Sequence, residues 1–159
     1  MIAGKSPILL EIGIVDATFG PDVKIVRPVN IYGCHIGGGT FVGPFTEIQR
    51  DVVIGRNCRV QSHSFICELV TIGDDCFIGH GVMFINDIFD ASGPAHGDRS
   101  KWRATRIGNR VSIGSNATIL PVVIADGAVI GAGAVVTRDI AEAGVYAGNP
   151  ARLVRLFSE

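Results

Sequence analysis

Apolar side chains recur at every sixth position over most of this 159-residue chain. The longest unbroken run of this spacing comprises Ile36, Val42, Ile48, Ile54, Val60, Ile66, Ile72, Ile78 and Phe84. With one-residue slips before Ile36 and after Ile119, the pattern also includes Ile25, Ile31, Ile107, Ile113, Ile119, Ile124, Ile130 and Val136. Six residues are three repeats of the two-residue strand period, but they are not a whole number of 3.6-residue helical turns. The pattern therefore predicts short strands joined by corners.

The spacing also predicts how these strands assemble. Three repeats make a triangular coil of 18 residues, and successive coils pair in parallel about 4.8 Å apart. The residue two places before many repeated positions is small, as at Cys34, Thr40, Thr46, Cys58, Ser64 and Cys76. Since strand side chains alternate between faces, these small residues also point inward. The sequence thus predicts an all-β fold, a parallel β-helix with a narrow core.

The four cysteines fit this core. Cys34, Cys58 and Cys76 occupy the small inward position, and Cys67 follows an inward isoleucine at a corner. No C-x-x-C pair is present, which leaves little support for a zinc or redox motif. The cysteines are therefore interpreted as core residues of a protein in a reducing compartment.

One long insertion interrupts the repeat. Phe84 and Ile107 are 23 positions apart where the pattern requires six, so a loop of about residues 86–106 leaves the coils. The loop is rich in charge and carries the only tryptophan, Trp102. Polar loops on rigid scaffolds commonly carry function, and Trp102 is expected to contact a substrate or a neighbouring subunit.

The end of the chain departs from the repeat. Residues 145–159 are expected to cap the last coil, and Asn149-Pro150 would begin a short helix over 150–157. A cap of this kind would cover strand edges that are otherwise open to aggregation. With no break in composition, residues 1–159 are expected to form a single domain.

Composition excludes several partners. The formal net charge of −1 lacks the basic excess of a nucleic-acid-binding protein. No apolar run approaches 18 residues, so no membrane span is expected. The first residues show no basic segment followed by a long apolar core, which predicts a cytoplasmic protein.

The hexapeptide pattern, the loop after it, and the ending IGAGAVVTRDI…VYAGNPAR resemble the left-handed β-helix acyltransferases. VQSHSFICELVTIGDDCFIGHGVMFIND, the Trp-containing loop and IGSNATILPVVI are similar to the N-acetyltransferases of nucleotide-linked amino sugars. The resemblance implies a left-handed helix, a homotrimer with active sites between subunits, and no metal. It also implies acetylation by acetyl-CoA of the amine of a UDP- or dTDP-linked amino-deoxysugar, for surface polysaccharide synthesis.

The resemblance also implies roles for residues at the start of the loop. In these enzymes the Asn of an F-x-N motif points at the sugar amine, and the motif here is FIN. Asn86 is therefore expected to orient the amine, although it cannot act as a base. Asp87 would support Asn86 or bind sugar hydroxyls. His80 is the candidate oxyanion donor or general base.

Spacing alone places further polar residues near this point. His63 and His80 follow repeat positions that are 18 residues apart, so they should share a corner on adjacent coils. Glu68 precedes Asn86 by 18 residues and should lie one coil away from it. All four side chains are expected to gather at the base of the loop, where His63 and Glu68 would contact substrate.

Acetyl-CoA in the resembling enzymes lies along the C-terminal coils. Small residues there let the pantetheine arm approach the backbone, and basic residues meet the phosphates. The matching positions are Gly114, Ser115, Ala132 and Gly133 for the arm, and Arg138, Arg152 and Arg155 for the phosphates.

Three alternatives remain open at this point. An O-acetyltransferase of the same fold would use a loop histidine, here His96, to deprotonate a hydroxyl. A non-catalytic β-helix could serve only as a scaffold. The γ-class carbonic anhydrases share the fold, but two of their zinc-binding histidines are five residues apart, and no histidine pair here has that spacing.

Overall fold

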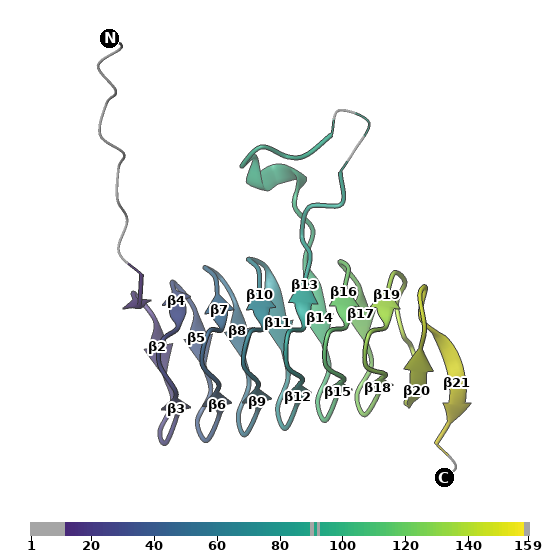
Figure 1. Cartoon of the computed structure of the whole chain (residues 1–159), viewed down its shortest axis with the longest axis horizontal. Coiled ribbons are helices and arrows are strands. Elements are labelled where there is room, and N and C mark those ends of the chain that lie inside the picture. Colours follow the sequence, from purple (N-terminus) through teal and green to yellow (C-terminus); the bar gives the residue numbers. More distant parts are fainter. Residues whose placement is uncertain (1–11, 90, 92, 158–159) are drawn as a thin grey trace.

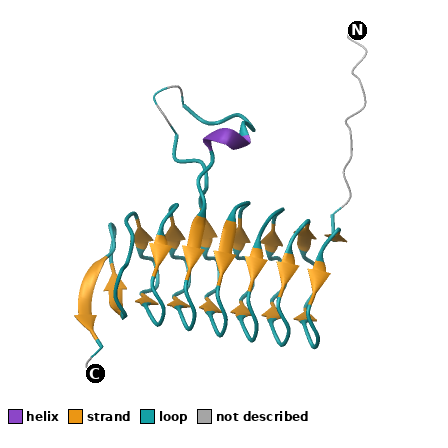
Figure 2. Ribbon diagram, turned by 180° about the vertical axis from the view of Figure 1, so that it is seen from behind, coloured by secondary structure: helices purple, strands orange, loops and turns teal. Residues whose placement is uncertain are grey.

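The chain folds into a left-handed parallel β-helix, seen in a computed structural model that describes residues 12–89, 91 and 93–157. Short strands wind into about seven stacked coils that form a triangular prism, with the long loop rising from its middle (Figure 1). Seen from behind, strands cover the body of the prism and the one short helix belongs to the loop (Figure 2). Within the described residues, no helix is long and apolar enough to cross a membrane.

Three sheets form the faces of the prism. Sheet A contains β1 (Ile14–Val15), β4 (Asn30–Tyr32), β7 (Glu47–Ile48), β10 (Phe65–Ile66), β13 (Met83–Phe84), β16 (Thr118–Ile119) and β19 (Val135–Val136). Sheet B contains β2 (Thr18–Phe19), β5 (His35–Ile36), β8 (Val53–Ile54), β11 (Val70–Ile72), β14 (Thr105–Ile107) and β17 (Val123–Ile124). Sheet C contains β3 (Lys24–Ile25), β6 (Phe41–Val42), β9 (Arg59–Val60), β12 (Phe77–Ile78), β15 (Ser112–Ile113), β18 (Val129–Ile130), β20 (Gly144–Ala147) and β21 (Arg152–Leu156).

The predicted repeat sets the register of all three sheets. In sheet B, Ile72 lies between Ile54 and Ile107, and all three side chains are buried. The small inward positions predicted from the sequence are buried as well, including Thr40, Thr46 and Ser64, whose hydroxyls donate to backbone carbonyls. One large and one small side chain per face fill a core too narrow for more.

Close stacking of the coils explains why glycine follows so many of the repeat positions. A Cβ atom on Gly79 would lie 2.6 Å from the backbone nitrogen of Ser115 in the next coil. The third residue of most four-residue corners adopts a left-handed conformation, as at His63 (φ 63°) and Gly133 (φ 69°). Equivalent corner residues of successive coils therefore lie directly above one another, and each such row of residues is called a column here.

The loop leaves the prism between β13 and β14, at the corner of sheets A and B, and spans residues 85–104. Its two limbs run together at the base, where the Arg103 amide donates to the Asn86 carbonyl at 2.9 Å. Farther out, Asp98 caps the short 3₁₀ helix η1 (Arg99–Lys101) by accepting from the Ser100 amide. The predicted insertion is confirmed in place, and β14 begins at Thr105.

The predicted C-terminal helix is wrong. Residues 152–156 form β21, which pairs antiparallel with β20. β20 would otherwise expose an open strand edge, and its unpaired backbone groups bind another strand more readily than a helix. The last segment therefore extends sheet C by one strand.

The four cysteines are free and buried. Burial raises the pKa of the Cys34 thiol to about 11 and the pKa of the Cys67 thiol to about 12. Cys58 and Cys76 each donate a hydrogen bond to a backbone carbonyl of the next coil. The Cys34 and Cys67 thiols are thus held neutral, and all four cysteine side chains are shielded from solvent in the core.

We expect none of these thiols to react with Ellman's reagent in the folded protein at pH 8. A thiol with a pKa of 11 is only about one part in a thousand thiolate at that pH, and the reagent needs both thiolate and access. All four should react after denaturation in guanidinium. Rapid labelling of one or more cysteines without denaturant would contradict the inward register.

Candidate functional site

His80 lies on the prism edge where sheets C and A meet, here called the C–A edge. Its Nδ1 lies 2.8 Å from Ser62 Oγ, directly below in the preceding coil. Its backbone amide donates to Ser115 Oγ, in the following coil, at 3.2 Å. The residue is exposed and Nδ1 contacts Ser62, so Nε2 is the ring nitrogen that a ligand could use.

His63 shares this edge but is offset by one position. It occupies the left-handed corner residue, whereas Ser62 is in register with His80. The His63 ring stacks on Phe45 of the preceding coil, with ring centroids 4.9 Å apart and planes inclined by 17°. The two histidines therefore lie on adjacent coils of one edge, and His63 packs against the aromatic ring below it.

Toward the C-terminus, the C–A edge becomes a track of small residues. Ser115 and Ala132 continue the column above His80, and Gly133 follows Ala132 in the left-handed corner position. Ala132 and Gly133 are exposed. Gly114 packs so closely beneath the Ala132 backbone that any side chain would collide. A flat, exposed strip of backbone beside an imidazole can receive a long, flexible acyl carrier.

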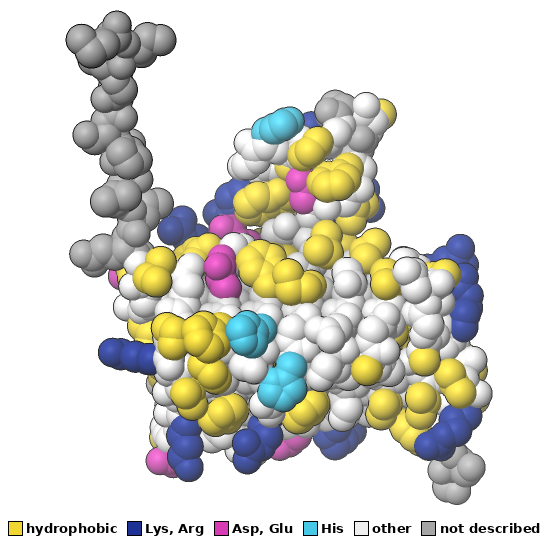
Figure 3. Space-filling model, in the orientation of Figure 1, with side chains coloured by type: hydrophobic (Ala, Val, Ile, Leu, Met, Phe, Trp, Pro, Cys, Tyr) yellow, Lys and Arg dark blue, Asp and Glu magenta, His cyan; other side chains and the backbone are white. Residues whose placement is uncertain are grey.

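Basic residues lie at the C-terminal end of the prism (Figure 3). Arg138 and Arg152 line one cavity of about 210 Å³, which also includes Tyr146. The Arg155 guanidinium lies over the Phe157 ring at 5.3 Å. The structure thus brings Arg138 and Arg152 together, while Arg155 packs against Phe157, just beyond the end of its own strand β21.

Asn86 and Glu68 lie on a different edge, where sheets A and B meet, here called the A–B edge. Asn86 Nδ2 donates to the Glu68 carbonyl at 3.3 Å, so the two residues are stacked on adjacent coils as predicted. The Glu68 amide in turn donates to Gln49 Oε1 in the coil below. Because Nδ2 donates to the Glu68 carbonyl, the side-chain Oδ1 of Asn86 is the atom that can accept a hydrogen bond from a ligand's N–H.

Arg99 fastens the loop to this edge. Its Nη2 lies 2.7 Å from Glu68 Oε2 and also donates to Asp51 Oδ2. The Glu68 side chain is only 14% exposed, and Oε2 forms this ion pair without the alignment of a hydrogen bond. One guanidinium therefore joins two coils to the helix η1 of the loop.

Replacing Arg99 with alanine should loosen the loop and leave the prism intact. The pair with Asp51 is exposed and contributes only about 0–1 kcal/mol. Loss of Arg99 also leaves the 14% exposed Glu68 carboxylate without its cation, so the melting temperature should fall slightly while the prism stays folded. Hydrogen–deuterium exchange of amides 98–103 should accelerate, because η1 loses its attachment. Arg110→Ala removes a looser pair to Asp126 (3.7 Å) on a distant edge and should leave the loop unchanged. Equal exchange in both variants would exclude the attachment.

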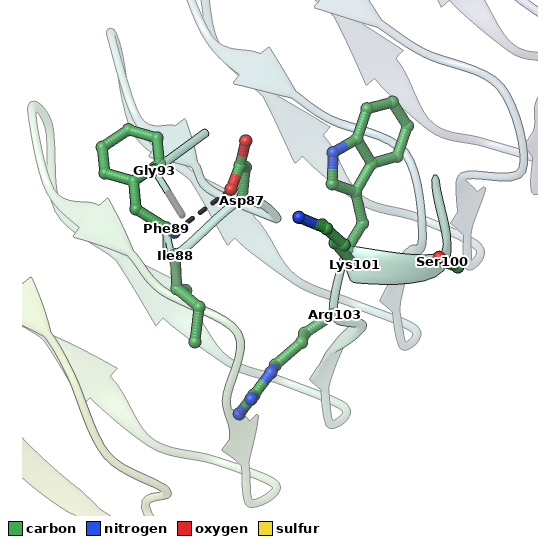
Figure 4. Close-up of a pocket in the computed structure, with 8 residues that line it drawn as sticks. Asp87, Ile88, Phe89, Gly93, Ser100, Lys101 and Arg103 are labelled. Carbon is green, nitrogen blue, oxygen red and sulfur yellow. Dashed lines mark hydrogen bonds between the residues drawn. The ribbon is translucent and has the colours of Figure 1, made fainter. Parts of the chain in front are cut away.

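Asp87 shapes the loop. Its carboxylate accepts hydrogen bonds from the Phe89 amide at 3.1 Å and the Ala95 amide at 2.8 Å. It lines a loop pocket of about 320 Å³ together with Trp102 and Arg103. Figure 4 shows the Asp87 carboxylate turned toward Phe89, while Arg103 points away from both. Asp87 is thus placed to support Asn86 by holding the outgoing limb.

The structure does not gather all the predicted residues at one point of the chain. His63 and His80 lie on the C–A edge, and Glu68 and Asn86 lie on the A–B edge. β13 runs between His80 and Asn86, so the width of sheet A separates them. A single chain thus carries two groups of functional candidates on opposite edges of one face.

Sequence reasoning missed four side chains that organise these groups. Ser62 precedes His80 by 18 residues, and Arg50 precedes Glu68 by the same interval, so the spacing contained a signal for both. Gln49 and Arg99 had no such signal, since their contacts depend on side-chain direction and on the path of the loop. Within the described residues, no group of three potential metal ligands is present.

Comparison with known proteins places the chain in a family. The model described as bacterial transferase hexapeptide (six repeats) matches residues 33–68. The model described as hexapeptide repeat of succinyl-transferase matches residues 69–83 and 104–138. Together they cover more than half of the sequence and leave out the loop.

One relative is the bifunctional protein GlmU of Acidithiobacillus ferrooxidans, 32% identical over 139 residues. The match covers 82% of this chain and 30% of that protein, so the chain spans less than a third of its relative's length. The similarity is thus confined to one part of the larger protein.

Solved structures share the fold. AntD, an N-acyltransferase from Bacillus cereus in complex with dTDP and 3-hydroxybutyryl-CoA, has a TM-score of 0.79 at 22% identity, covering 89% of this chain and 83% of that one. A galactoside acetyltransferase in complex with coenzyme A has a TM-score of 0.60 at 29% identity, covering 89% and 65%. A maltose O-acetyltransferase from Clostridium difficile has a TM-score of 0.55 at 25% identity, covering 89% and 71%. The chain belongs to the bacterial hexapeptide-repeat transferases and has the fold of their left-handed β-helix acyltransferases.

Proposed function

We propose that this protein transfers the acetyl group of acetyl-CoA to the amine of a UDP- or dTDP-linked amino-deoxysugar. The observation that carries the proposal is Asn86, whose amide nitrogen is occupied by the Glu68 carbonyl and whose oxygen is left to accept from an amine. The fold shared with AntD, crystallised with dTDP and an acyl-CoA, supports it. Such a product would serve surface polysaccharide synthesis, and acetyl-CoA as donor fits a cytoplasmic location.

The chemistry is direct transfer between two bound substrates. The neutral amine attacks the thioester carbonyl, a C–N bond forms, and the C–S bond breaks to release the CoA thiolate. The proton lost by nitrogen passes to His80 Nε2 or to the departing thiolate, which leaves CoA as the thiol. Holding both substrates in line supplies much of the rate enhancement, and no acyl-enzyme is required.

The acetyl-CoA arm would lie along Ser115, Ala132 and Gly133 on the C–A edge. This would place the thioester beside His80. Arg152, together with Arg138 at the A–B corner after β19, would meet the phosphates at the C-terminal end of the prism. Gly114 would act indirectly, because its lack of a side chain lets the next corner approach. The acceptor would lie on the A–B edge, at Asn86 and Glu68.

A homotrimer would join these two groups. Neither edge alone holds both substrates, since the width of sheet A separates them. Packing of three prisms about a threefold axis brings the A–B edge of one subunit to the C–A edge of the next. The outward face of sheet A between the edges carries Phe65, Met83 and Val135, which suits burial between subunits.

O-acetylation of a sugar or small alcohol is the second candidate. The likeness to a galactoside acetyltransferase and a maltose O-acetyltransferase favours it. His96 would then serve as the base, and it is exposed on the loop with a left-handed backbone (φ 51°). It makes no contact with Asn86, so the amine acceptor agrees better with the geometry.

The test is a CoA-thiol release assay with acetyl-CoA and paired acceptors that differ only in an amine or a hydroxyl. Turnover with a UDP- or dTDP-linked amino sugar, and not with its hydroxyl partner, is the expected result. Turnover only with hydroxyl acceptors, lost in His96→Ala, would replace the proposal with O-acetylation. Absence of CoA binding would leave only a scaffold.

A further inference from the structure

One column on the A–B edge includes a cation that the proposed chemistry does not yet use. Arg50, Glu68 and Asn86 are separated by 18 residues each and occupy the same corner position in three successive coils. Ile48 pairs with Ile66 beneath the first step, and Asn86 bonds to the Glu68 carbonyl at the second. The column therefore presents a guanidinium, a carboxylate and an amide in that order.

The position below Arg50 in this column is Gly33. A Cβ atom there would lie 3.0 Å from Arg50 Cγ and 3.3 Å from Arg50 Cα. Gly33 also has φ of 60°, a conformation that favours glycine. The missing side chain lets Arg50 lie close over the backbone of the preceding coil, on the side away from Asn86.

Arg50 borders a cavity of about 690 Å³ that also includes Tyr32, Asn30 and Asp16. Burial raises the pKa of Tyr32, the carboxylates of Glu47 and Glu68 raise it further, and Arg50 opposes them. The phenol hydroxyl is therefore close to the same column. An aromatic ring, an amide and a carboxylate around one cavity match the needs of a nucleoside, whose base stacks and whose ribose hydroxyls donate.

The charges near Arg50 leave it available to an anion. Glu68 and Asp51 are paired with Arg99, and Glu47 accepts from Gln49 Nε2. Among the described residues Arg50 forms no salt bridge. Arg99 adds a second cation to this stretch of the edge and offsets part of the negative charge of Glu68 and Asp51.

We propose that Arg50 binds the diphosphate of a nucleotide-linked acceptor whose nucleoside occupies the cavity beside Tyr32. The inference rests on the proposed function and gives the acceptor a direction along the A–B edge. Two coil spacings, about 10 Å, separate Arg50 from Asn86. That interval holds a hexose with its diphosphate at Arg50, a hydroxyl at Glu68 and its amine at Asn86.

Calorimetric titration of the full-length protein with dTDP and with UDP, in the absence of sugar, tests the subsite. Wild type should bind at least one of them, and Arg50→Ala should weaken that affinity by about tenfold or more, since a charge-assisted phosphate contact is lost. Arg50→Lys should recover part of it. Arg110→Ala, the same charge change on a distant edge, should match wild type.

Kinetics separate this role from a general loss of structure. Arg50→Ala should raise KM for the nucleotide-linked acceptor by about tenfold or more and change kcat and the KM for acetyl-CoA by about twofold or less. Thymidine or uridine, which lack phosphates, should bind wild type and variant equally. Equal dTDP or UDP affinity in wild type and Arg50→Ala would overturn the subsite. So would a wild type that binds neither diphosphate, and acetyl transfer to the nucleotide-linked amino sugar in that case would leave the proposed function standing.

Discussion

Ile72→Asp is expected to leave the chain unfolded at room temperature. Ile72 is 1% exposed and lies between Ile54 and Ile107 in the narrow core. Removing a buried isoleucine side chain costs about 2–5 kcal/mol, and an unpaired buried carboxylate adds several kcal/mol more. Domains of this size are stabilised by only about 5–15 kcal/mol. Circular dichroism and thermal melting of the purified variant measure the result.

The neighbouring residue provides a matched control. Thr71 belongs to the same strand but points outward and is exposed. Thr71→Asp introduces the same carboxylate one residue away, beside Arg106 of the next coil, and should melt within a few degrees of wild type. A folded Ile72→Asp, or an unfolded Thr71→Asp, would mean that the assigned inward register is wrong.

Asn86→Ala is expected to reduce acetyl transfer by more than about tenfold, through loss of amine orientation. The side chain is half-buried and makes one weak hydrogen bond to the Glu68 carbonyl, so its removal should barely change stability. The loss should appear in kcat, because binding of the nucleotide part of the acceptor does not involve this residue. Steady-state kinetics with the accepted amino sugar measure it.

Asn57→Gly is the control for this substitution. Asn57 lies at the corner of sheets B and C, where its side chain donates to Asp75, and glycine suits its left-handed backbone (φ 55°). Its kcat should equal that of wild type. If Asn86→Ala turned over at the wild-type rate, Asn86 would have no part in orienting the amine.

The regular part of the fold was predictable because it depends on spacing. A buried position every six residues determines strand, corner and coil together, and each coil repeats the last one. The C-terminal strand β21 was not predictable in this way. Asn149 and Pro150 favour a helix start locally, but the open edge of β20 offers backbone partners that only the folded prism creates.

For the site, the sequence could predict which residues stack on one another at equivalent corners of successive coils. The 18-residue interval correctly stacked Asn86 on Glu68. Applied to His80, the same interval gives Ser62, which was not among the predicted residues but lies beneath His80. The spacing also contained the separation of the two pairs, because His80 and Asn86 are one six-residue repeat apart and therefore occupy neighbouring corners of a coil. The Arg99 ion pairs depend on a loop that obeys no repeat.

The division of the site between two edges of sheet A is tested most directly by mixing two inactive variants. Asn86→Ala disables the acceptor edge, and Ala132→Trp obstructs the small-residue track of the other edge. If each site joins the A–B edge of one subunit to the C–A edge of its neighbour, co-expressed trimers should regain activity. In randomly assembled trimers, about half of the subunits have an intact A–B edge and about half have an intact C–A edge. About a quarter of the sites should therefore combine two intact edges, which gives about a quarter of wild-type turnover. Turnover no greater than that of the separate parents would contradict a site shared between subunits.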